Sequence, residues 1–127
     1  MKNLLVVMGV SVLLMAATPL VQAADPVGVG FFRAVDDLPL MPGLTEQADE
    51  AVVFDQPDGR IVEVTATGTA AVTGASVTAF YDETLPQLGW VRDGSGGYVR
   101  DRERLTIQYG TQTGGPLRVK FAIQPLG

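Results

Sequence analysis

The residues that could do chemistry in this chain are carboxylates and arginines, because its 127 residues include no histidine and no cysteine. Those absences remove the usual base at neutral pH, the thiol nucleophile and nearly every zinc or copper site. Adjacent acidic pairs occur at 36–37, 49–50 and 82–83. Neighbouring side chains alternate between the faces of a strand or diverge by about 100° on a helix, so adjacency alone makes no catalytic dyad. We therefore expect no enzymatic activity. The alternative is a small cell-wall hydrolase with two carboxylates facing each other across a cleft.

The serines and the acidic residues in turns are predicted to have structural roles. Beyond residue 24 the chain has two serines, Ser76 and Ser95, and one lysine, Lys120. Ser76 stands where a helix cap is needed and Ser95 lies in a glycine-rich turn, so we expect no Ser–Lys hydrolase. Asp55 and Asp58 flank a turn and offer oxygen ligands that suit calcium, but the spacing of an EF-hand is absent. We expect neither a metal nor a cofactor.

Basic residues are concentrated near the C-terminal end. Residues 24–89 carry eleven acids and two bases, whereas residues 90–127 carry three acids and six bases. Alternation in RLTIQY (104–109) and LRVKFAI (117–123) places Arg104, Arg118 and Lys120 on the face opposite the apolar residues. We predict a binding surface there, with Arg100 and Arg102 at its rim, for an envelope protein or an anionic envelope polymer. The alternative is an ordinary solvated sheet face whose charge the acidic N-terminal arm neutralises.

Residues 1–23 have the layout of a secretory signal peptide. Lys2 precedes an apolar run over 4–18, and residues 21–23 place small side chains where signal peptidase reads them. The run is shorter than the roughly 20 residues of a transmembrane helix. We expect cleavage after Ala23, with Ala24 as the alternative, and a periplasmic or secreted protein with no membrane span in the mature chain. That location and the net charge of −5 argue against nucleic acid as a partner.

The rest of the chain divides into an N-terminal arm and one domain. Residues 24–50 contain three prolines and no sustained period, and their apolar side chains predict an extended arm lying on the domain. The alternative is a free segment that binds another protein. Residues 51–127 form the predicted domain. Its predicted strands lie at 51–54, 60–67, 90–92, 98–100, 104–109 and 117–123.

The stretch AFYDETLPQLGW (79–90) predicts the single helix. From Val77 onward, apolar residues of the predicted helix recur at spacings of three or four and form one stripe: Val77, Phe80, Tyr81, Leu85 and Leu88. Ser76 is the predicted N-cap, Pro86 kinks the last turn, and Gly89 ends the helix before Trp90 starts a strand beneath it. The chain therefore predicts a two-layer α+β fold, an antiparallel sheet of about five strands covered by one amphipathic helix.

The combination of Phe80, Tyr81, Leu85, Gly89 and Trp90, followed by a hairpin and two strands, resembles a module of uncharacterised small bacterial envelope proteins. The resemblance covers residues 51–123. It implies the fold and an envelope setting, and it carries over no catalytic residue. The prediction is an exported, non-enzymatic binding module of the cell envelope.

Two further ways of binding remain open. One is a small-ligand carrier with a pocket between helix and sheet near Tyr81 and Trp90. The other is pairing of a guest strand with a sheet edge, where the PLMPGL segment (39–44) covers one edge until a partner displaces it.

Overall fold

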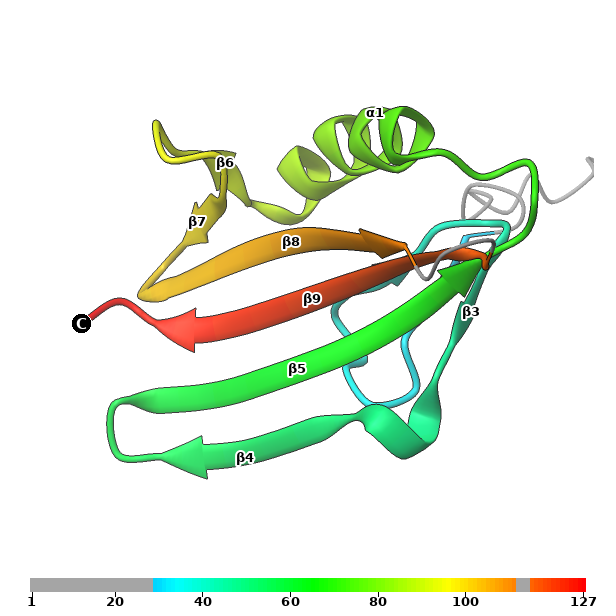
Figure 1. Cartoon of the computed structure of the whole chain (residues 1–127). Helices are drawn as coiled ribbons and strands as arrows, with labels where there is room; N and C mark the ends of the chain where they lie inside the picture. The colour runs from blue at the N-terminus through cyan, green and yellow to red at the C-terminus, as the bar shows by residue number, and fades with distance from the viewer. Residues whose placement is uncertain (1–28, 112–114) are drawn as a thin grey trace, which may run out of the picture.

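The computed structural model describes residues 29–111 and 115–127 as an α+β fold (Figure 1). The predicted signal peptide and its cleavage site lie outside these residues. One helix covers one face of a seven-stranded antiparallel sheet. The predicted fold class is confirmed, with seven strands in place of about five. No helix in the described part of the chain is long and apolar enough to cross a membrane.

The sheet is built around three long strands. Its strands are β3 (Leu44–Glu46), β4 (Val52–Gln56), β5 (Gly59–Gly68), β6 (Val91–Arg92), β7 (Tyr98–Arg100), β8 (Glu103–Thr111) and β9 (Leu117–Pro125). Their order is β3-β5-β9-β8-β7-β6, and β4 also pairs with β5. β3 and β4 occupy successive stretches of the same edge of β5, separated by the 3₁₀ turn η1 (Ala48–Glu50).

β9 lies in the centre of the sheet, between β5 and β8. Phe121 pairs with Val64 on one side and with Ile107 on the other. The predicted alternation is confirmed: Val119, Phe121 and Ile123 are buried on the face that the helix covers. The long strands thus form the sheet side of a single apolar core, opposite the helix.

The helix α1 (Gly74–Thr84) continues into a 3₁₀ turn, η2 (Leu85–Leu88). Its N-cap is Thr73, and the prediction of Ser76 is wrong because Thr73 is already extended and caps the first turn. The hydroxyl of Thr73 accepts from the Ser76 N–H at 3.1 Å, and the Ser76 hydroxyl accepts from the Thr73 N–H at 3.0 Å. This reciprocal pair is a capping box. Gly89, with a φ of 90°, ends the helical segment as predicted.

Residues 30–50 lie against the domain. β1 (Gly30–Phe31) and β2 (Pro39–Leu40) form a small two-stranded sheet. Between them Phe32, Val35 and Leu38 are buried. The hydroxyl of Tyr81 donates to the carbonyl of Pro39 at 2.8 Å and accepts from the Met41 N–H at 3.1 Å. The helix therefore holds this segment by hydrogen bonds between the Tyr81 side chain and the backbone as well as by apolar contact.

The centre of the core is aromatic. The Phe121 ring lies 5.1 Å from Phe32 and 5.0 Å from Tyr81, both in edge-to-face geometry. Trp90 is also fully buried, at 1% exposure. Phe121 thereby joins the N-terminal segment, the sheet and the helix at one point.

Candidate functional site

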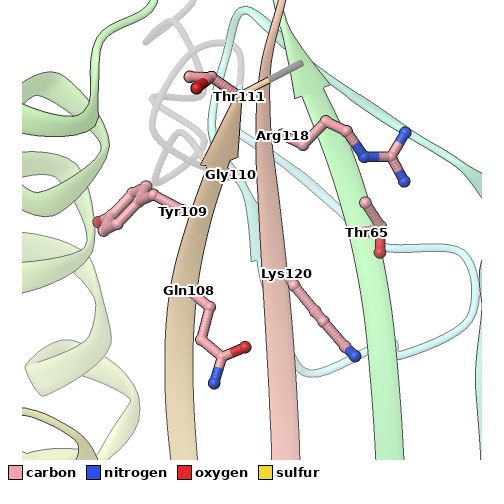
Figure 2. Close-up of a pocket in the computed structure, with 7 residues that line it drawn as sticks. All are labelled: Thr65, Gln108, Tyr109, Gly110, Thr111, Arg118 and Lys120. Atoms are coloured by element: carbon pink, nitrogen blue, oxygen red, sulfur yellow. The ribbon is translucent and has the colours of Figure 1, made fainter. Parts of the chain in front are cut away.

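The sheet face away from α1, called here the open face, carries a polar set of side chains (Figure 2). Pairing across three strands puts them in two rows: Thr65, Lys120 and Gln108 in the first, and Thr67, Arg118 and Gly110 in the second. Tyr109 extends instead toward the helix, where its hydroxyl lies 2.7 Å from the Thr78 hydroxyl. Strand alternation thus sends hydroxyl, amide and cationic groups to one surface.

A hollow of about 330 Å³ opens on this surface, lined by Thr65, Gln108, Tyr109, Gly110, Thr111, Arg118 and Lys120. Gly110 has no side chain, and a Cβ built there would meet nothing within 4 Å. Thr65 is only 9% exposed. The missing side chain of Gly110 therefore leaves space on β8 beside Arg118 and Lys120 of β9.

Each cation of the open face has a carboxylate partner. Arg118 Nη2 lies 2.6 Å from Glu50 Oε1, and Lys120 Nζ lies 2.7 Å from Glu63 Oε1. Further along the same face, Arg104 Nη2 lies 3.1 Å from Asp93 Oδ2. Ion pairs exposed to this degree contribute only about 0–1 kcal/mol each, so another carboxylate or a phosphate can replace these partners at little cost.

The predicted binding residues do not all lie together. Arg104, Arg118 and Lys120 share the open face, although Arg104 is opposite Gln124, four residues or about 13 Å along the strand from the row of Lys120. Arg102 lies in the turn between β7 and β8. The placement of Arg100 at the rim of this face is wrong.

Arg100 points to the helix side of the sheet. Val99 pairs with Arg104 on the open face, so the next residue, Arg100, has its side chain on the opposite face. Its guanidinium carbon lies 4.3 Å from the centroid of the Trp90 ring, a cation–π contact. Arg100 therefore serves the packing of the fold.

Arg100 belongs to a network of four charges that the sequence did not predict. Arg60 donates to both oxygens of Asp37, at 3.0 and 2.8 Å, and to Glu103 at 2.7 Å. Arg100 donates to Asp37 at 2.7 Å. The hydrogen bonds from Arg60 are the main cause that lowers the pKa of Asp37 to about 2. These contacts fasten residues 33–38 to the sheet.

The lowered pKa of Asp37 predicts an acid-sensitive contribution to stability. Since the folded pKa is about 2 and the ordinary value is 3.8, the contribution is complete above pH 3.8 and is lost as the pH falls through 2. Solvent screening of this partly exposed carboxylate limits it to about 1 kcal/mol. Asp37→Asn should therefore be less stable than the wild type at pH 7, by urea unfolding, and the difference should shrink between pH 4 and 2. Asp58→Asn, an exposed turn substitution, is the control; a difference for Asp37→Asn that stays constant down to pH 2 would refute the assignment.

The hydrolytic alternative finds little support among the described carboxylates. A general acid needs a raised pKa, whereas the pKa of Asp37 is lowered by Arg60 and that of Asp93 is lowered chiefly by the Ser95 hydroxyl. Ser76 lies in the first turn of α1, on one side of the sheet, while Lys120 lies on the other. Within residues 29–111 and 115–127, no three acidic side chains come together as a metal site.

The interior near Tyr81 and Trp90 is occupied by side chains. Both residues and Phe121 are at most 1% exposed, and burial raises the pKa of the Tyr81 hydroxyl. The hollow on the open face is instead accessible, and its lining includes hydroxyl, amide and cationic groups. No family model, curated protein or solved structure matches the chain.

Proposed function

We propose that the chain is an exported, non-enzymatic binding module of the bacterial cell envelope, and that its open face receives an anionic group of the partner. The observation that carries the proposal is the hollow over Gly110, bounded by Arg118 and Lys120. Residues 1–23, with the layout of a signal peptide, support the location.

The chemistry of the hollow favours a polar ligand that bears carboxylates or phosphates. An incoming anion takes the place of Glu50 at Arg118 or of Glu63 at Lys120, and each exchange keeps the cation paired. Gln108 and the threonines beside it offer an amide and hydroxyls to sugar or peptide groups. An acidic segment of an envelope protein and an anionic envelope polymer share this chemistry.

The test is a titration of the ¹⁵N-labelled predicted mature chain, residues 24–127, with three probes: oligo-glutamate, oligo-galacturonate and inorganic phosphate. We expect amide shifts at Thr65, Gln108, Gly110 and Lys120 for at least one probe. Shifts confined to other surfaces, or no shift with any probe, would count against the site. The three probes separate a peptide source of the anion from a glycan or a phosphate source.

Gly110→Val is the sharpest variant, because it fills the hollow without removing a charge. A valine suits a strand and meets no neighbour at its Cβ, so stability should stay within about 1 kcal/mol of the wild type. We expect at least a tenfold loss of affinity, or about 1.4 kcal/mol, in the same titration. Unchanged binding in this variant would show that the ligand lies outside the hollow.

Reversing the charge of two residues tests the electrostatic contribution to binding of the anionic probes. Arg118→Glu with Lys120→Glu should abolish binding of the anionic probes, since both cations that bound the hollow are lost. Arg33→Glu makes the same type of change at an exposed residue of the N-terminal segment and should bind nearly as the wild type does. Equal losses in both proteins would indicate a general charge effect.

A further inference from the structure

β4 is an open edge strand of unusual composition. It pairs with β5 on one side, and no other strand within residues 29–111 and 115–127 pairs with it (Figure 1). All five of its residues are exposed, including Val52, Val53 and Phe54 at 43, 51 and 46%. Every second residue of such a strand directs its N–H and C=O away from the sheet. This edge therefore combines free backbone groups with exposed apolar side chains.

Acidic residues flank these apolar positions. Asp49 and Glu50 precede the strand in η1, Asp55 lies within it, and Asp58 follows in the turn. Among the described residues only Glu50 of these four forms an ion pair, with Arg118. Arg60, opposite Asp55, is bound to Asp37 and Glu103 instead. The edge therefore carries uncompensated negative charge at both ends of its apolar centre.

The negative charge at both ends of β4 determines which kind of strand can pair with this edge. A second copy of β4, laid alongside in either direction, would bring its own acids against these acids, and like charges in adjacent strands are destabilising. Charged residues in edge strands commonly serve to prevent such self-pairing. A guest strand with basic ends satisfies both the backbone groups and the charges.

We propose that β4 binds an extended peptide segment with apolar residues at its centre and Lys or Arg at both ends, which adds to the sheet as an eighth strand. Val52 and Phe54 share the open face with Glu63 and Ile61, while Val53 lies on the helix side, so the guest packs apolar side chains on both faces. Its basic ends lie near Asp49 at one end and Asp55 at the other. This surface and its ligand charge are distinct from those of the hollow over Gly110.

The probe is a capped peptide with lysine at each end and alternating valine and threonine between them. Titrated into residues 24–127, it should protect alternate β4 amides from hydrogen exchange and bind at least tenfold more tightly than the same peptide with glutamate ends. Binding should weaken between about 50 and 500 mM salt. An N-methylated version should not bind, because it cannot donate to the edge. Equal binding of both charge forms, or protection outside β4, would overturn the proposal.

A charge swap on the protein gives the reciprocal test. Asp49→Lys with Asp55→Lys changes exposed residues that form no ion pair within 29–111 and 115–127, and it should reverse the preference toward the glutamate-ended peptide. Asp36→Lys with Glu83→Lys makes the same net change elsewhere on exposed positions and should leave the preference for lysine ends. An unreversed preference in the β4 variant would contradict the assignment.

Two more outcomes are decisive. If the chain alone sediments as a dimer that protects the same β4 amides, the occupant is a second copy and the basic peptide is rejected. The Arg118→Glu, Lys120→Glu variant should still bind the lysine-ended peptide, so failure of the hollow and failure of the edge are distinguishable.

Discussion

Replacing Phe121 by alanine is expected to lower the free energy of unfolding by about 4 kcal/mol, from the cavity left in the core and the loss of two aromatic contacts. Phe121 is fully buried on the central strand and contacts Phe32 and Tyr81. A domain of this size has a total stability of roughly 5–15 kcal/mol, so the variant should be near the limit of folding at 37 °C. Urea unfolding followed by the fluorescence of Trp90, the one tryptophan, measures the loss.

Phe54→Ala is the matched control for this prediction. It removes the same atoms from a phenylalanine that is 46% exposed on β4, and it should cost less than about 1 kcal/mol. Similar losses of stability in Phe54→Ala and Phe121→Ala would mean that Phe121 is not at the centre of the core. Phe121→Leu, which keeps most of the volume, should recover a large part of the stability.

Tyr81→Phe is expected to cost about 2–3 kcal/mol, although it removes a single oxygen. That hydroxyl satisfies the Pro39 carbonyl and the Met41 N–H, and the ring itself is fully buried. Without the hydroxyl the two backbone groups lose their hydrogen-bond partner, so the loss of stability should be concentrated in residues 30–41. Urea unfolding gives the total cost, and hydrogen exchange at the Met41 amide should accelerate most.

Tyr109→Phe makes the same chemical change at a surface tyrosine that is 43% exposed. Its hydroxyl meets the exposed Thr78 hydroxyl, and water replaces that contact, so we expect a cost of about 0.5 kcal/mol or less. If the Met41 amide exchanges at the wild-type rate in the Tyr81→Phe variant, then the Tyr81 hydroxyl does not hold the N-terminal segment.

The long periodic elements of the fold were predictable from the sequence. Alternation over 60–67, 104–109 and 117–123 identified β5, β8 and β9, and the apolar stripe from Val77 to Leu88 identified α1 and η2 as one predicted helix. The short strands β4, β6 and β7 were also predicted, but not every short element was. β3 has three residues, too few to show a period, and Thr73 was overlooked as the cap because Ser76, its partner in the capping box, satisfies the same preference.

The candidate site was predictable only in part, because it depends on register. Alternation alone placed Arg104, Arg118 and Lys120 on one face. It could not supply their partners: Glu50 and Arg118 are 68 residues apart, and their contact requires η1 to lie at the end of β4. Arg100 was misplaced because YVRDRER does not reveal which arginine lies in the turn. Asp101 takes a φ of 53° there, and this two-residue turn sets Arg100 against Glu103.

The central position of β9 has a consequence for how the fold is acquired. β5 and β8 do not pair with each other, so the two halves of the sheet have no shared hydrogen bonds until β9, the last of its strands along the chain, lies between them. A polypeptide that emerges from a ribosome or a translocation pore N-terminus first thus keeps the two halves of its sheet unjoined until β9 has emerged. Pairings so distant in sequence make folding slow, typically milliseconds to seconds. A truncation that removes β9 would therefore separate the sheet into two parts, whereas removal of an edge strand would leave the remaining strands paired.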